Sequence, residues 1–135
     1  MTDLETDSFT EIVKSILEDG IIDDAEVRAL RKRLYADNKI EKDEADALFE
    51  LNNGVKGKSN DDTWVYLFTD AICDFLLKDK TSPGVVDDDE GAWLIKKIEG
   101  DGEIDVTEKA LLKKLKERAA SLPANLLEKL KSWGI

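Results

Sequence analysis

The stretch EDGIIDDAEVRAL, residues 18–30, decides the fold, because it holds the end of one helix and the start of the next. Gly20 suits the left-handed conformation that closes a helix. Asp23 is well placed as the next N-cap, and Glu26 follows at the spacing of a capping box. A hydrophobic staple flanks this cap: Ile22 and Val27. The stretch therefore predicts a tight junction between two helices.

The same junction recurs along the chain. A shift of 64 residues aligns 9–57 with 73–121 without a gap and gives 12 identities in 49 positions. That is several times the chance expectation, and it predicts a tandem duplication. Within each half the motif recurs after 18 residues, from Ile22 to Ile40 and from Val86 to Ile104. Four junctions of one kind are therefore expected.

Helical periodicity completes the predicted fold, which is all-α, a single domain over 1–135 with an internal pseudo-two-fold relation between its halves. The first helix carries its apolar residues on one face. The half-repeats cover about 8–53 and 61–120, with 52–60 as a flexible link. The expected helices are 8–18, 24–36, 42–52, 61–79, 88–99, 106–120 and a C-terminal helix at 123–132. The fourth is apolar nearly all round, which is typical of a buried helix. The last carries a docking stripe: Leu126, Leu127, Leu130 and Trp133.

Composition and charge exclude several classes of function. The chain has no histidine and one cysteine, Cys73, which excludes imidazole or thiolate metal sites and His-based nucleophilic catalysis. A lone cysteine in an apolar run indicates a buried hydrophobe and a reducing compartment. The net charge of −11 disfavours nucleic acids and anionic lipid surfaces as partners. No run approaches the roughly twenty apolar residues of a membrane span, and the acidic N-terminus is no secretory signal.

Asp-Gly-x-Ile-Asp-x-x-Glu also matches the second half of an EF-hand loop, but the first half is missing. The first loop position would be Ser15, Arg33, Asp79 or Lys97 in the four copies, and two of these are basic. An 18-residue spacing also leaves no room for separate helix pairs. The junctions are not standard EF-hands.

Binding of a divalent cation such as Ca²⁺ or Mg²⁺ at the acidic junctions remains a hypothesis. Crowded carboxylates repel one another and raise their own pKa values, and an oxygen-binding cation would stabilise them. Successive junctions are about 18 Å apart along a helix and cannot share an ion. Junctions related by the duplication could face each other. The preferred metal residues are Asp19, Asp23, Asp24 and Glu26 with Asp87, Asp88, Asp89 and Glu90. A second set joins Asp37, Glu41 and Glu44 with Asp101, Asp105 and Glu108. The alternative is that these residues act only as helix caps and solvated acidic faces.

The four junctions and the duplicated halves resemble the TerB family of tellurite-resistance proteins. That family has an acidic ADG-x-I-x-x-x-E turn that opens a helix. The matching stretches are EDGIIDDAE (18–26), ADNKIEKDE (36–44), SPGVVDDDE (82–90) and GDGEIDVTE (100–108), with Asn38 and Pro83 as departures from the pattern. The resemblance covers about residues 8–120. It implies a helical, cation-binding module and a cytoplasmic role in stress-response or membrane-associated complexes.

Three classes of function follow. The preferred expectation is a non-enzymatic TerB-like module that binds divalent cations and protein partners, with no nucleic acid and no direct membrane insertion. The alternative is an acidic inhibitor or immunity-type protein that binds a basic partner. An enzyme with paired carboxylates is disfavoured, because the acidic residues recur as caps in every copy and no cofactor fingerprint is present.

Overall fold

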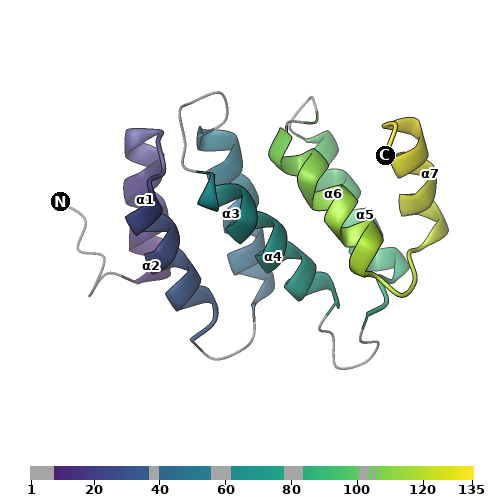
Figure 1. Cartoon of the computed structure of the whole chain (residues 1–135), viewed down its shortest axis with the longest axis horizontal. Helices are drawn as coiled ribbons and strands as arrows, with labels where there is room; N and C mark the ends of the chain where they lie inside the picture. The colour runs from purple at the N-terminus through teal and green to yellow at the C-terminus, as the bar shows by residue number, and fades with distance from the viewer. Residues whose placement is uncertain (1–7, 37–39, 56–61, 78–83, 101–103, 105) are drawn as a thin grey trace. The chain divides into compact units, whose positions relative to one another are not determined.

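The structure is a computed structural model that describes residues 8–36, 40–55, 62–77, 84–100, 104 and 106–135. Over this part of the chain it is built from α-helices without a named strand, which confirms the predicted all-α class (Figure 1). Predicted and observed helix ends agree to within three residues. The helices are α1 (Phe9–Asp19), α2 (Asp24–Leu34), α3 (Lys42–Val55), α4 (Thr63–Leu77), α5 (Asp88–Glu99), α6 (Val106–Arg118) and α7 (Ala124–Ser132).

The chain divides into two compact units, Met1–Ala71 and Ile72–Ile135. Unit 1 holds α1, α2, α3 and the first half of α4, and unit 2 holds the end of α4 with α5, α6 and α7. The division falls one residue before Cys73, where the second half of the sequence repeat begins. The duplication stays a prediction, because it concerns the origin of these units. The single domain and the pseudo-two-fold relation also stay predictions, because they concern how the units are placed relative to one another.

Unit 1 packs around aromatic side chains of α3 and α4. The Phe68 ring meets Phe49 edge-on at a centroid distance of 5.0 Å and lies 5.7 Å from Trp64. Trp64 is buried, and its indole Nε1 donates a hydrogen bond to Asn52 Oδ1 at 3.2 Å. Pairing the two polar groups offsets the cost of burying either one alone. The prediction that the fourth helix contributes mainly buried side chains is confirmed.

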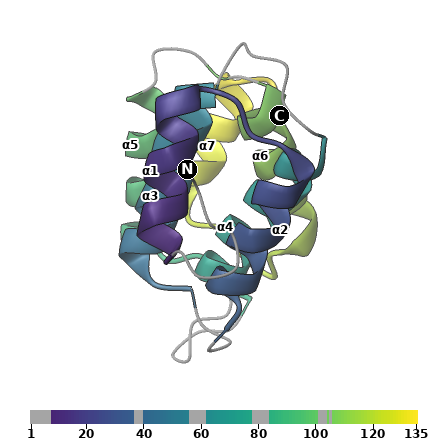
Figure 2. The ribbon, with the colours of Figure 1, turned by 90° about the vertical axis from the view of Figure 1, so that its left-hand side faces the viewer.

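The predicted flexible link over 52–60 is wrong for its first four residues, because α3 continues to Val55. Gly54 lies where Leu17 of α1 approaches the last turn of α3, and a Cβ at this position would collide with the Leu17 side chain. Asn and Gly favour a loop by propensity, but packing against a neighbouring helix outweighs propensity in most protein helices. Figure 2 shows α1 on the side of unit 1 that faces the viewer, with α3 behind it.

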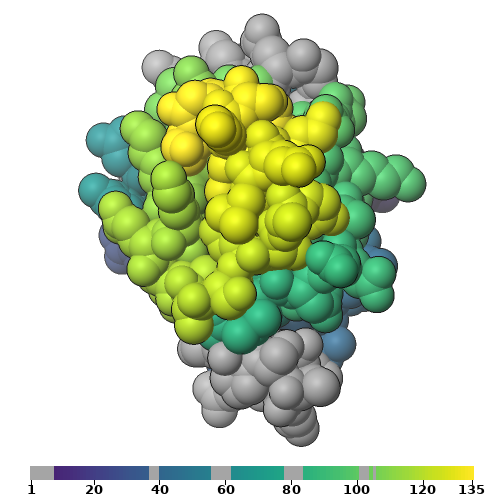
Figure 3. All heavy atoms as spheres, turned by 90° about the vertical axis from the view of Figure 1, so that its right-hand side faces the viewer, coloured from purple at the N-terminus to yellow at the C-terminus, as the bar shows by residue number. Residues whose placement is uncertain are grey.

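Unit 2 includes α7, which lies between α5 and α6 on the face drawn in Figure 3. Leu126 and Leu130 are buried, and Trp133 is half-buried, as the predicted docking stripe requires. The prediction is wrong for Leu127, whose side chain is 47% exposed. The buried side of α7 therefore includes fewer residues than the helical periodicity predicted.

Gly91, in the first turns of α5, makes room for the start of α7. It is buried, and a Cβ there would lie 2.7 Å from Pro123 Cγ and 2.9 Å from Asn125 Oδ1. Asn125 Nδ2 also donates to the Asp88 carbonyl oxygen at 3.3 Å. The equivalent position in the first half is Val27, the residue of the predicted staple, which is buried in unit 1.

We expect Gly91→Ala to lower the free energy of unfolding by about 1–3 kcal/mol, because the proline ring cannot rotate away from the added methyl group. Urea denaturation followed by circular dichroism measures the change. A combined Gly91→Ala and Pro123→Ala variant should recover part of the loss, since the two positions are in contact.

Gly54→Ala is the matched control, because it makes the same change inside a helix. The nearest atom there is the end of the flexible Leu17 side chain, which can rotate. Alanine should then keep its helix propensity advantage of up to about 1 kcal/mol. Equal effects of the two substitutions would contradict the close packing of α7 at Gly91.

Candidate functional site

The junction between α1 and α2 contains the first four predicted metal residues. Gly20 closes α1 with a φ of 76°, and Asp23 caps α2. Glu26 N donates to Asp23 Oδ1 at 2.8 Å, and Asp23 N donates to Glu26 Oε1 at 3.1 Å. The predicted capping box is confirmed, and each carboxylate commits one oxygen to the backbone.

The start of α5 repeats this arrangement in unit 2. Glu90 N donates to Asp87 Oδ1 at 2.8 Å, and Asp87 N donates to Glu90 Oε1 at 3.1 Å. A related bond joins Glu41 N to Glu44 Oε1 at 2.8 Å before α3. The acidic residues of the repeated motif therefore serve first as caps, which satisfy backbone N–H groups at helix starts.

The two predicted metal groups belong to different units. Asp19, Asp23, Asp24 and Glu26 lie in unit 1, and Asp87, Asp88, Asp89 and Glu90 lie in unit 2. Within the described ranges, no group of three or more Asp, Glu, His or Cys side chains is placed to hold a metal ion. Asp37, Asp101 and Asp105 of the second set lie outside those ranges. A shared cation between the junctions stays a prediction.

Asp24 has other partners in unit 1. It forms an ion pair with Arg28, one turn further along α2. Thr63 Oγ1, at the start of α4, donates to Asp24 Oδ1 at 3.5 Å. Asp24 therefore connects α2 to the first turn of α4, and this structural role accounts for its position.

The pKa of Glu26, in the first junction, is raised above the usual value of a glutamate. Partial burial raises the pKa of Glu26, and the negative charges of Asp23 and Asp19 raise it further. The hydrogen bond from the Asp23 backbone N–H acts in the opposite direction. Two aspartates of the same junction thus add to the effect of burial on Glu26, and crowding between the two predicted metal groups stays a prediction.

We expect Glu26→Gln to change the pH dependence of stability. Folding raises the Glu26 pKa, so the protonated carboxyl adds to the free energy of unfolding. This contribution is fully present below the unfolded pKa of about 4.3, and it is lost as pH rises through the folded pKa. Glutamine stays neutral and still accepts the capping hydrogen bond. The variant should therefore gain stability relative to the natural chain as pH rises from 4 to 7, measured by urea denaturation at each pH.

Glu11→Gln is the matched control, since Glu11 holds the same capping-box position in α1. Its N-cap is the neutral Ser8, and the Glu11 side chain is exposed. If Glu26→Gln and Glu11→Gln gave identical stability profiles against pH, burial and the neighbouring aspartates would not affect Glu26.

A groove of about 500 Å³ lies in unit 1 beside α1 and α3. Apolar surface comes from Phe9 and Val13 of α1 and from Ala47 of α3. Four carboxyl-bearing residues line it as well: Glu41, Asp43, Glu44 and Glu50. The polar residues Ser8 and Thr10 complete the lining. Apolar surface surrounded by acidic side chains is suited to a ligand that is both cationic and apolar.

The groove follows from how α1 and α3 pack. Ser8 and Glu41 line it at the starts of the two helices, and Leu17 and Gly54 approach each other at their ends, so the helices run in the same direction. Ala47 is small and half-buried, which leaves space between its longer neighbours on α3. The two helix starts contribute only about half a positive charge each, less than four carboxylates supply.

Sequence reasoning missed most of this groove. Glu41 and Glu44 were candidates for a different site, and Phe9 and Val13 belong to the apolar face predicted for the first helix. The available signal was a small residue, Ala47, amid the acidic residues of α3. A small residue on α3 predicts a groove only once α1 is known to pack against that face of α3.

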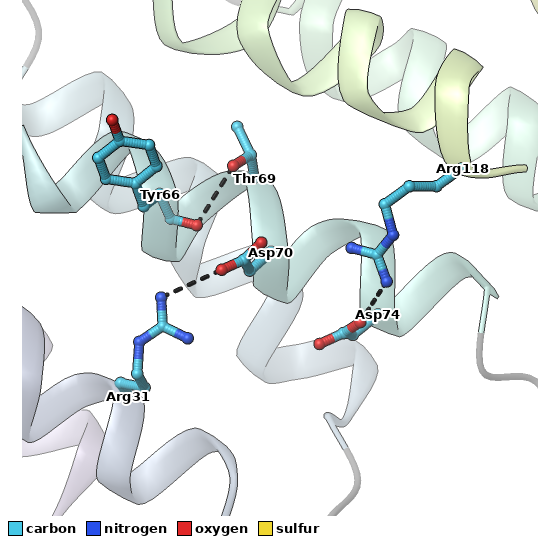
Figure 4. Close-up of polar contacts among 6 residues, drawn as sticks. All are labelled: Arg31, Tyr66, Thr69, Asp70, Asp74 and Arg118. Carbon is cyan, nitrogen blue, oxygen red and sulfur yellow. Dashed lines mark hydrogen bonds and ion pairs between the residues drawn. The ribbon is translucent and has the colours of Figure 1, made fainter.

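Arginines in each unit are directed to carboxylates of α4 (Figure 4). In unit 1, Arg31 of α2 lies 3.3 Å from Asp70, with Nη2 and Oδ2 as the atoms. In unit 2, Arg118 Nη2 at the end of α6 lies 2.9 Å from Asp74 Oδ1, and the Asp74 side chain is only 13% exposed. Each of these two arginines therefore neutralises a carboxylate of α4.

Comparisons with protein-family models, curated proteins and solved structures gave no match. The resemblance to the TerB family therefore stays a prediction. In the part of the chain that the structure describes, every helix is too short or too polar to cross a membrane.

Proposed function

We propose that this chain is a non-enzymatic, acidic helical module that binds a basic protein partner. The groove of unit 1 carries this proposal, because it combines apolar surface with four carboxyl-bearing residues. Apolar contact supplies affinity, and complementary charge supplies specificity and fast association. An acidic inhibitor or immunity-type protein is one form that such a module takes.

The charge of the chain supports a basic protein over other partners. A net charge of −11 repels nucleic acids and anionic lipid surfaces. Asp43 and Glu50 are exposed at the groove, and within the described ranges neither forms an ion pair. Lysine or arginine side chains of a partner would meet these carboxylates at the edge of the apolar surface.

A binding role is also supported by what the acidic residues already do. Asp23, Glu26, Asp87 and Glu90 each accept a backbone hydrogen bond in a capping box. Acid–base catalysis by a carboxyl pair needs two groups in different environments, one protonated and one ionised, beside a substrate site. The repeated capping boxes give these four carboxylates the same structural role in both units.

We expect the chain to bind oligolysine and not oligoglutamate of equal length, with an affinity that falls about tenfold or more between roughly 0.05 M and 0.3 M salt. Fluorescence anisotropy of labelled peptides measures this. Asp43→Asn with Glu50→Gln should weaken binding more than Glu117→Gln with Glu128→Gln. The second pair removes equal charge from exposed positions of unit 2. Absence of oligolysine binding at low salt would refute the basic partner.

Divalent-cation binding at the first junction is a second candidate function. The observation that favours it is the capping box, which holds the Asp23 and Glu26 carboxylates next to one another. Burial raises the Glu26 pKa, the charges of Asp23 and Asp19 raise it further, and a cation would relieve that added repulsion. Ca²⁺ and Mg²⁺ suit carboxylate oxygens, and each capping carboxylate has one oxygen beyond its capping bond. The equivalent residues of unit 2 would form the same kind of site.

Calorimetric titration of EDTA-treated protein with Ca²⁺ and Mg²⁺ tests this candidate. Saturable binding at micromolar affinity is expected, with loss in Asp23→Asn or Asp87→Asn. Asparagine is as good an N-cap as aspartate, so these variants remove the charge and keep the helix start. Weak heats that vanish with added salt would leave the junctions as caps only.

The proposed duplication is supported by the matching capping boxes of the two units. The boxes at Asp23 and Asp87 have the same geometry and stand 64 residues apart. A TerB-like identity and a place in a tellurite-resistance or stress-response system rest on the sequence resemblance alone.

A further inference from the structure

The predicted repeat gives the groove an equivalent surface in unit 2. A shift of 64 residues relates Phe9 to Cys73, Val13 to Leu77, Glu44 to Glu108 and Ala47 to Leu111. All four residues of unit 2 are buried, at 7% exposure or less. In unit 1, Val13 is as buried as Leu77, but Phe9, Glu44 and Ala47 are only half-buried. Three of the four equivalent positions are therefore more exposed in unit 1 than in unit 2, and we call this face open in unit 1 and closed in unit 2.

The open face also differs in charge from its closed equivalent. Asp43 and Glu50 of the groove correspond to Thr107 and Lys114 in unit 2. The two exposed carboxylates thus belong to the open copy alone, and no capping bond explains Glu50, which lies in the middle of α3. The open face therefore carries two carboxylates at positions where the closed face has a threonine and a lysine.

We propose that the groove beside α1 and α3 binds an amphipathic basic helix of a partner protein. Its apolar stripe would cover Phe9, Val13 and Ala47, and its lysines or arginines would lie against Asp43 and Glu50. A helix is the occupant because side chains at i, i+3, i+4 and i+7 present one continuous apolar stripe with cations on either side. This inference rests on the proposed function and adds the shape of the partner to it.

Two peptides of identical composition separate helix recognition from general attraction of charge. One carries leucines at i, i+3, i+4 and i+7 among lysines, and the other carries the same residues in an order without helical amphipathicity. In fluorescence anisotropy at about 0.15 M salt, the amphipathic peptide should bind at least about tenfold tighter than its isomer. Both peptides have the same charge, so a difference reports the apolar stripe.

Ala47→Trp fills the groove without changing its charge and should weaken binding of the amphipathic peptide about tenfold or more. Ala92→Trp makes the same change at an exposed position of α5 and should leave the affinity unchanged. Circular dichroism establishes whether both variants fold. As a second measurement, amide chemical shifts of the natural chain should change on peptide addition at Phe9, Val13 and Ala47.

The outcomes distinguish the two proposals. Equal affinity for the two peptides, or shift changes confined to residues outside the groove, would overturn the helix groove and leave the basic partner standing. Failure to bind either peptide at low salt would overturn both. Self-association of the chain that Ala47→Trp abolishes would make a second copy the occupant and would overturn a separate partner.

Discussion

The reciprocal capping box is the interaction on which the rest of the structure depends. Every helix begins with backbone N–H groups that have no partner inside the helix. In α1, α2 and α5 the N-cap side chain accepts one of these and the glutamate three residues later accepts the N-cap N–H. Because both bonds are local, one helix can end at Gly20 and the next begin at Asp24 without a long connection. Short junctions of this kind allow helices of 9–15 residues to pack against one another.

The same device explains much of the acidity of the chain. Aspartate and glutamate are favoured at helix starts, where they cap the backbone and meet the positive end of the helix dipole. Repeating the junction multiplies these residues, and at Glu26 two neighbouring aspartates add to the rise in pKa that burial causes. The arginines that would offset the charge are partly directed elsewhere, to Asp70 and Asp74 on α4. The groove adds to these structural carboxylates the exposed side chain of Glu50, which lies in the middle of α3 and has no capping role.

Some features could be read from the sequence because they depend on residues close together in the chain. The Asp23–Glu26 and Asp87–Glu90 boxes were predicted from a three-residue spacing, and the structure confirms both. The link over 52–60 could not be read in this way. Asn52 is held by Trp64 and Gly54 by the approach of Leu17, and both contacts come from other helices. Leu127 fits the helical period of α7 but stays exposed. The period predicts which side of the helix is apolar, whereas the neighbouring helices decide how many residues of that side are buried.

The sequence by itself determined the all-α class, the positions of the helices and the caps that separate them, since these follow from local hydrogen bonds and a 3.6-residue period. Only the tertiary structure decided which acidic residues share a surface. It assigns the two predicted metal groups to different compact units and brings Asp43 and Glu50 beside Phe9 and Val13. The physical reason is that a groove belongs to two helices at once. The packing of α1 against α3 depends on side-chain volumes, such as those of Ala47 and Gly54, and spacing along one helix does not contain that information.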